Sequence, residues 1–462
     1  MPDTYLPAPA DTTGIRATTR IPVRFSGDGA GIGPLSWGQR EIWLTMLRQR
    51  SWLPIGGWAP LPAGTAIEDV VADLQWAMHR YPTFRTRLRF DAGGEPLQTV
   101  AAQGTIGLDV FDVPPGADPE AYTAAVDAHY RAQSYDFVAD WPVRMGVVRV
   151  GGSPAYLSTV TCHLVTDGVG GRLMLREVAA RAEAAPTTGL QPLDQVRWQA
   201  SPDGLKQRER ALKHWDRMLR QLPPAGPLAE RPGPRHHRGE FRSAALYTAT
   251  HTVSTIADLD TSQVLMTFLA IALTDQAGDG RPAVIRPMVD NRFRRGLGDV
   301  VAMVAQHGIC VADVAGRPFA DALRQTGIAA MLAYKWAYHD PAAVQAHART
   351  LAGTLGIDLD AGIWFNDRRT ISRQMFPGDA PTAEQVHAAA PGEFRWTAAQ
   401  DDPYDPLNID VDDEPGHFLL TWFTDTWRNP PARVEALARS VEAIAVHQAL
   451  QALSTAAETR TP

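Results

Sequence analysis

One short segment of the chain carries residue types that can move a proton. The sequence HLVTDG, from His163 to Gly168, follows the β-rich segment Tyr156–Cys162 and precedes a run of residues with helical spacing. This order predicts an imidazole at the end of a strand and the carboxylate of Asp167 at the start of a helix. Histidine suits general-base chemistry because its pKa lies near neutrality. A buried histidine beside a helix-capping aspartate is an equally good interpretation of these residues alone.

Three other polar segments are weaker candidates for chemistry. The segment Asp401–Glu414 holds seven acidic residues but lacks the glycine of an EF-hand loop, so we expect a solvated loop. His236 and His237 have no cysteine or acid at ligand spacing. The glycine-rich segment Gly27–Gly33 lacks the Lys-Ser/Thr pair of a phosphate-binding loop. The sequence therefore predicts no metal site, and it contains no GxSxG motif of a serine hydrolase.

The composition is that of a globular protein with a sizeable core. The chain has 462 residues, of which 45% are hydrophobic and 21% charged, and its formal net charge is −7. This mildly acidic balance predicts no binding to nucleic acid. Two cysteines, Cys162 and Cys310, rule out a disulfide scaffold and fit a reducing compartment. The N-terminus lacks an apolar leader and the apolar run Val264–Thr274 is too short to cross a bilayer, so we expect a cytoplasmic protein without a membrane segment.

Helical and strand patterns alternate along both halves of the chain. Apolar spacing predicts helices at Glu41–Gln49 and Ala66–Tyr81, the second ended by Pro82. Strand-like segments follow at Phe84–Phe90 and Pro142–Val150. This alternation predicts two α/β lobes. We place a disordered lead-in at residues 1–20, an N-terminal lobe at 21–185, a connecting helix and loop at 186–240, and a C-terminal lobe at 241–455.

The HLVTDG segment is accompanied by five others that form an ordered pattern. They are PLSWGQREIW (Pro34–Trp43), MHRYPTFRTRLRF (Met78–Phe90), SYDFVADWPVRMGVV (Ser134–Val148), ALKHWDRMLRQLPP (Ala211–Pro224) and the segment that contains Asn291 and Arg292. In this order they resemble motifs of the condensation-domain superfamily of nonribosomal peptide synthesis. CHLVTDG stands in the place of that superfamily's HHxxxDG motif, and the resemblance extends over roughly Pro34–Leu450.

The resemblance implies a particular α/β fold. Two chloramphenicol-acetyltransferase-like lobes would form a V-shaped pseudo-dimer, with the HxxxDG loop where they meet. A tunnel at that junction would admit the phosphopantetheine arm of a carrier protein from each face. We expect such a chain to be a monomer.

The resemblance also implies roles for residues of the loop. His163 corresponds to the second, catalytic histidine, which either takes a proton from the attacking group or positions it. Asp167 would pair with Arg292, on a strand of the other lobe, and so fix the direction of the imidazole. Gly168 would let the backbone approach the substrate arm closely, although a simple helix-start glycine is the alternative.

Several residues depart from the family pattern or fit it less specifically. Cys162 replaces the first histidine of the motif, and we interpret it as a small buried hydrophobe and not as a nucleophile. Glu41 stands where the family has an arginine. Ser36, from the opening segment, and Asn366, from a late strand, are candidates for lining the tunnel. For Asn366 a turn-forming role is the alternative.

The implied function is a stand-alone condensation enzyme. It would transfer an acyl or aminoacyl group from a carrier-protein thioester to an amine, forming an amide in natural-product biosynthesis. We expect no adenylation or carrier segment in the remaining residues, so carrier proteins would act in trans, and no cofactor beyond the phosphopantetheine of the substrate. The alternatives are ester formation with an alcohol acceptor, for which coenzyme A is a candidate acyl carrier, and a non-catalytic recruitment domain.

Overall fold

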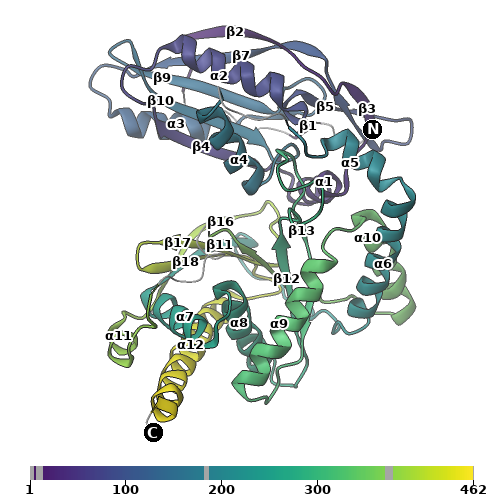
Figure 1. Ribbon diagram of the computed structural model, residues 1–462, viewed down its shortest axis with the longest axis vertical. Coiled ribbons are helices and arrows are strands. Elements are labelled where there is room, and N and C mark those ends of the chain that lie inside the picture. The colour runs from purple at the N-terminus through teal and green to yellow at the C-terminus, as the bar shows by residue number, and fades with distance from the viewer. Residues whose placement is uncertain (1–4, 7–13, 182–186, 370–377, 461–462) are drawn as a thin grey trace. The chain divides into compact units, whose positions relative to one another are not determined.

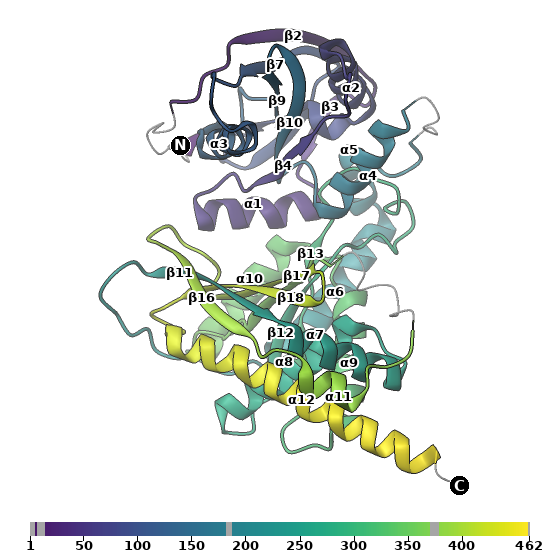
Figure 2. The same cartoon turned by 90° about the vertical axis from the view of Figure 1, so that its left-hand side faces the viewer.

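The computed structural model describes residues 5–6, 14–181, 187–369 and 378–460 of the chain (Figure 1, Figure 2). Its contacts divide the chain into two compact units. Unit 1 comprises residues 1–208 and 290–305, and unit 2 comprises residues 209–289 and 306–462. The prediction of two α/β units is confirmed. The chain nevertheless returns from unit 2 into unit 1 at residue 290 and leaves it again after residue 305.

Unit 1 is built around a five-stranded sheet. Its strands lie in the order β2 (Thr19–Ser26), β7 (Gln103–Asp112), β9 (Val143–Val150), β10 (Ser153–Cys162) and β4 (Pro54–Pro60), and only the β7–β9 pair is parallel. Smaller sheets consist of β3 (Gly31–Pro34), β6 (Pro96–Val100) and β5 (Thr86–Phe90), and of β1 (Tyr5–Leu6) with β8 (Tyr135–Asp136). Val147 of β9 and Val160 of β10 are fully buried. The core of unit 1 therefore holds β10 firmly up to its last residue.

The local sequence explains where two of the helices of unit 1 begin or end. They are α1 (Trp37–Gln49), α2 (Ile67–Arg80), α3 (Pro119–Ala132), α4 (Gly168–Ala179), α5 (Pro192–Gln199) and the first part of α6 (Pro202–Leu219). α1 begins at a capping box, in which Ser36 Oγ accepts from Gln39 N–H and Gln39 Oε1 accepts from Ser36 N–H. Pro82 ends α2, as predicted, because it cannot donate a backbone hydrogen bond.

The chain after Pro82 differs from the prediction. We expected a strand from Phe84, but residues Pro82–Arg85 form a 3-10 helix, η1, and β5 begins only at Thr86. Proline at the first position of η1 presets its own φ for a helical turn, which favours the turn over an extended segment.

Unit 2 contains an eight-stranded sheet. Seven strands lie in the order β13 (Gln306–His307), β12 (Ala283–Val289), β15 (Ile363–Asp367), β17 (Leu407–Glu414), β18 (His417–Asp425), β11 (His236–Ser243) and β16 (Glu393–Gln400), and β14 (Cys310–Ala312) pairs with β12. The neighbours β12, β15 and β17 are parallel, and the other pairs are antiparallel. The mixture of parallel and antiparallel strands is consistent with the predicted α/β class.

Helices cover one face of the sheet of unit 2. α7 (Ala244–Ala257), α8 (Thr261–Ala277) and α12 (Pro431–Arg460) pack against it (Figure 1), and the unit also contains α9 (Phe319–Lys335), α10 (Pro341–Leu355) and α11 (Ala383–Ala388). Val264, Phe268 and Leu269 of α8 are buried, which confirms the predicted core helix. Among the described residues no single helix is long and apolar enough to cross a membrane, and α7 with α8 meets that test only as a pair bent by 114°.

The predicted boundaries need correction at three places. The lead-in lies largely outside the described residues, and β2 begins at Thr19, inside the range given to the lead-in. β11 begins at His236, which is buried, so the supposed connecting loop supplies part of the sheet of unit 2. The segment 290–305, which we assigned to the C-terminal lobe, belongs to unit 1.

Candidate active site

The HLVTDG segment forms the expected turn between a strand and a helix. β10 ends at Cys162 and α4 begins at Gly168, so His163 directly follows the strand. Asp167 is the N-cap of α4, and its Oδ1 accepts a hydrogen bond from Gly170 N–H at 2.8 Å. The short polar side chain satisfies an N–H group that has no partner within the helix. The loop between strand and helix is therefore fixed at both ends.

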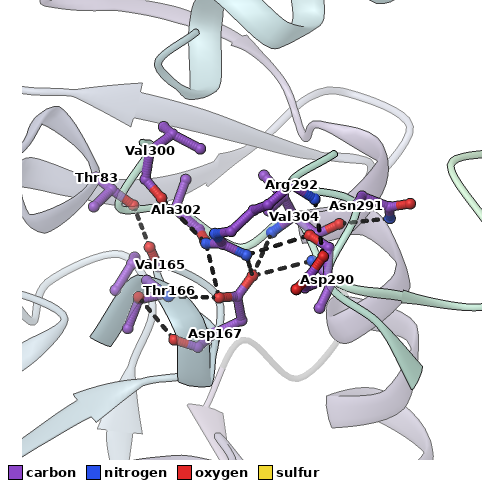
Figure 3. A network of polar contacts seen from close by, with 12 residues as sticks. Thr83, Val165, Thr166, Asp167, Asp290, Asn291, Arg292, Val300, Ala302 and Val304 are labelled. Carbon is purple, nitrogen blue, oxygen red and sulfur yellow. Dashed lines mark hydrogen bonds and ion pairs between the residues drawn. The ribbon is translucent and has the colours of Figure 1, made fainter. Parts of the chain in front are cut away.

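Asp167 also forms the ion pair that the resemblance implied (Figure 3). Arg292 Nη1 donates to Asp167 Oδ2 at 2.9 Å, and Arg292 Nη2 lies 2.9 Å from Oδ1. Only 7% of the arginine side chain and 4% of the aspartate side chain are exposed. A bidentate, buried pair of this kind fixes the orientation of both groups, and each charge depends on the other for its neutralisation.

The segment 290–305 wraps around this ion pair. Val304 N–H and Ala305 N–H donate to Asp167 Oδ2 at 3.0 and 3.1 Å, and Arg292 Nη2 donates to the carbonyl of Val300 at 3.1 Å. Asn291, fully buried at φ +57°, donates from Nδ2 to the carbonyl of Val304; asparagine tolerates this left-handed conformation better than most residues. We had expected the pair to link the loop to the other lobe. It instead lies within unit 1, because these contacts draw the segment onto the loop.

His163 is partly exposed, but one edge of its ring is buried. Nδ1 is shielded from solvent and has no hydrogen-bond partner among the described residues. Burial lowers the pKa of His163, and the opposing influences of its own carbonyl, the Asp167 carboxylate and the Thr166 carbonyl are smaller. The imidazole is therefore mainly neutral at neutral pH, and the shielded Nδ1 is the ring nitrogen less available to a substrate.

Cys162 is a buried, unreactive thiol. It is 0% exposed, and Sγ donates weakly to the carbonyl of Trp52 at 3.6 Å. Burial raises the pKa of the thiol to about 12, so almost no thiolate exists at neutral pH. Trp52 stacks on Tyr135 with ring centroids 5.2 Å apart, and Arg144 lies 4.7 Å from the centroid of the Trp52 ring. These contacts agree with the interpretation of Cys162 as a small buried group.

Two residues that we did not single out hold the loop in place. Thr83, fully buried in η1, donates from Oγ1 to the carbonyl of Val165 at 2.5 Å. At Gly170, an added Cβ would lie 2.6 Å from Thr166 Oγ1 and 3.1 Å from Arg292 Nη2. Thr83 lies inside the family-like segment Met78–Phe90, but only its contact with a loop remote in sequence identifies its role.

Gly168, the glycine of the motif, has more room than Gly170. A Cβ at Gly168 would have Arg172 Nη1 as its nearest neighbour, at 3.7 Å, which is an ordinary contact. Packing against the described residues therefore does not require glycine there. Close approach to a substrate arm stays a prediction.

The two candidates for lining a tunnel have described structural partners. Ser36 is buried, with 1% exposure, and caps α1. Asn366 lies on β15 of unit 2, where Nδ2 donates to Asp410 Oδ1 at 3.1 Å; it is therefore in a strand and not in a turn. A lining role for either residue stays a prediction. Among the described residues, no group of three or more His, Cys, Asp or Glu side chains is arranged to hold a metal ion.

Replacing Gly170 with alanine is expected to destabilise the protein by about 1–3 kcal/mol, because the new methyl group overpacks the space beside Thr166 and Arg292. The measurement is the free energy of unfolding in urea. Gly171→Ala is the matched control, since a Cβ at Gly171 meets nothing within 4 Å. Equal stability of the two variants would contradict the close packing at Gly170.

The fold and the loop together define a class of protein. A His-x-x-x-Asp-Gly loop between a strand and a helix, on a chain of two α/β units, is the arrangement of a chloramphenicol-acetyltransferase-like protein. The family model of the condensation domain matches residues 61–305, which is more than half of the chain. The chain belongs to the condensation-domain family.

Curated relatives match parts of much longer proteins. Cyclosporin synthetase simA of Tolypocladium inflatum is 25% identical over 174 residues, which are 35% of this chain and 1% of that protein. The probable non-canonical nonribosomal peptide synthetase CymA of Salinispora arenicola (strain CNS-205) is 28% identical over 339 residues, 65% of this chain and 4% of that protein. The chain thus corresponds to a small part of each relative's length.

Solved structures share the fold over nearly the whole chain. A condensation domain that mediates chain release from the enacyloxin polyketide synthase has a TM-score of 0.70 and 18% identity, with 96% of this chain and 85% of that chain covered. The epimerization domain TycB3(E) of tyrocidine synthetase B (0.65, 14% identity, 93% and 100% covered) and the X-domain from teicoplanin biosynthesis (0.65, 16% identity, 90% and 94% covered) are also similar. The fold is therefore shared by a condensation domain, an epimerization domain and an X-domain.

Proposed function

We propose that this chain is a condensation-type acyltransferase, in which His163 serves the transfer of an acyl or aminoacyl group from a carrier-protein thioester to an amine. The observation that carries the proposal is the state of His163: a neutral, partly exposed imidazole with Nδ1 buried, on a loop clamped by Asp167 and Arg292. The carrier-protein partner is proposed from family membership, since the condensation domains of peptide synthetases work on carrier-bound substrates.

The proposed reaction balances without a further cofactor. The lone pair of the amine attacks the thioester carbonyl, an amide C–N bond forms, and the C–S bond breaks to release the pantetheine thiol. The amine loses one proton and the departing sulfur gains one. Neutral Nε2 of His163 can either accept the proton of the amine or hold the amine in position for attack, and both roles require the same unprotonated ring.

Two alternatives remain within the same fold. An alcohol acceptor would give an ester, and the loop residues do not distinguish nitrogen from oxygen. The buried thiol of Cys162 at the place of the first histidine favours, more weakly, a recruitment domain without turnover. Retention of His163 and of the Asp167–Arg292 pair favours catalysis.

A transfer assay read by mass spectrometry tests the proposal. Acyl and aminoacyl groups on carrier proteins are offered together with a panel of amines and alcohols to the wild type, to His163→Ala and to His447→Ala, which changes an exposed histidine of α12. Amide from the wild type and from His447→Ala, but not from His163→Ala, is the expected result. If an ester is the main product, the proposed acceptor is an alcohol and not an amine. If none of the three proteins forms product but the chain binds a carrier or tailoring enzyme tightly, a non-catalytic recruitment domain is favoured.

The lowered pKa of His163 predicts a pH profile for the transfer. The neutral ring is the active form, so kcat/KM should be constant around neutrality and should fall as the pH drops through a value below the ordinary 6.5. The acceptor is an amine with a pKa below about 5, so that it stays unprotonated across the pH range of the titration. The pH at which kcat/KM falls to half of its plateau could instead lie above the ordinary histidine pKa of 6.5. That result would contradict the proposal that the partly buried, neutral imidazole is the active form.

A further inference from the structure

A groove in unit 1 lies away from the HLVTDG loop. Its volume is about 850 Å³, and it is bounded by α2, by the ends of β2 and β7, and by Arg181, which follows α4. The paired residues Phe25 of β2 and Gly104 of β7 both line it. A cleft of this volume falls within the range of small-molecule sites.

One wall of the groove is a fixed face of α2. Ala72, Trp76 and His79 follow one another at helical spacing and all line the groove. Gln75 Nε2 donates to the carbonyl of Arg24 at 2.7 Å, and His79 Nδ1 lies 2.6 Å from the carbonyl of Ser26. These two contacts attach α2 to the outer edge of β2, so the groove keeps its width without a ligand.

The lining is cationic and aromatic. Arg24 is exposed and forms no ion pair with any described residue, and Arg181 forms an ion pair with Asp73 of α2. Neither Asp nor Glu occurs among the described residues that line the groove. The half-buried Trp76 supplies apolar surface, and Phe25, which is 5% exposed, adds a smaller area beside it. Guanidinium groups bind carboxylates and phosphates in preference to neutral groups.

The groove is separate from the catalytic histidine. α4 begins beside the HLVTDG loop and runs for 12 residues, or about 18 Å of helix, before the chain reaches Arg181. A ligand bound at the Arg181 end cannot touch the atoms that react at His163. The groove is therefore not explained by the acyl-transfer chemistry.

We propose that this groove binds a small organic anion, with its carboxylate or phosphate on Arg24 and its planar apolar body against Trp76 and Phe25. The charge of the lining selects an anion, and the aromatic wall selects a ligand with a ring or an acyl body. The proposal does not depend on the proposed acyltransferase activity.

Binding of 2-naphthoate, measured by calorimetry and by saturation-transfer NMR on the full chain, tests the groove. Arg24→Gln should weaken binding by about tenfold, the effect expected for losing one charge-assisted contact. Ala72→Leu, which narrows the groove from α2, should weaken it as well. Arg89→Gln, which changes an exposed arginine of β5 outside the groove, is the matched control and should leave binding unchanged.

The neutral analogue 2-naphthalenemethanol separates charge recognition from adsorption of the ring. We expect it to bind at least about tenfold more weakly than 2-naphthoate. Three results would each overturn the proposal: equal binding of the two compounds, equal binding of 2-naphthoate to Arg24→Gln and the wild type, and no binding at millimolar concentration. Since Arg24 is exposed, its substitution should leave the fold intact, so a change in 2-naphthoate binding can be assigned to the lost guanidinium group.

Discussion

Replacement of His163 by alanine is expected to lower the rate of acyl transfer by about 10²- to 10⁴-fold, the usual effect of removing a positioned acid–base group. The fold should survive, because the side chain is only partly buried and Nδ1 makes no hydrogen bond with a described residue that the substitution would break. The measurement is the single-turnover rate constant of acyl transfer from one carrier-bound donor. The urea unfolding curve of the same variant is measured alongside it to check that the fold is retained.

The matched variants separate chemistry from structure. His447→Ala should keep both the wild-type rate and the wild-type unfolding midpoint. His163→Gln retains a polar group of similar reach but cannot act as a base of comparable strength, so it should remain impaired. A rate for His163→Ala within twofold of wild type would remove His163 from the reaction.

Breaking the Asp167–Arg292 pair is expected to cost about 3–5 kcal/mol of stability for either single alanine variant. Both side chains are nearly inaccessible, so each substitution leaves a charged partner buried without compensation. Asp167→Ala also removes the acceptor for Gly170 N–H, Val304 N–H and Ala305 N–H. Loss of soluble protein at 37 °C, or a large decrease of the unfolding midpoint, is the expected observation.

The double variant and a surface pair provide the controls. Asp167→Ala/Arg292→Ala should cost less than the sum of the single variants, because the second substitution removes the charge stranded by the first. Asp112→Ala breaks the pair with Arg149, whose side chains are 38% and 31% exposed, and should cost about 1 kcal/mol or less. Similar values for Asp167→Ala and Asp112→Ala would contradict the buried character of the Asp167 pair.

Local sequence predicted the elements around the site better than it predicted their long-range contacts. The helix at Ala66–Tyr81 was expected almost as it is found, since its apolar period and Pro82 are both local properties. The turn at HLVTDG followed from the change between strand-like and helical spacing. The Asp167–Arg292 pair required the family resemblance, because no local pattern links residues 125 positions apart.

The features that we missed depend on contacts between distant segments. Thr83 is one of many buried threonines, and only its hydrogen bond to Val165 distinguishes it. Gly170 is notable because Thr166 and Arg292 lie beside it, whereas the glycine of the motif, Gly168, has space. The assignment of 290–305 to the wrong unit has the same cause: the segment joins unit 1 through amide hydrogen bonds that its composition does not reveal.

The return of the chain into unit 1 has a consequence for its synthesis. Arg292 leaves the ribosome 125 residues after Asp167, which at about 5–20 residues per second is a delay of about 6–25 s. During that interval the aspartate lacks its arginine, and the segment 1–208 remains an incomplete unit although all its strands are present. A fragment cut at residue 208 would keep this defect permanently. The HLVTDG loop thus reaches its final geometry only after residues 209–289, the first part of unit 2, have been translated.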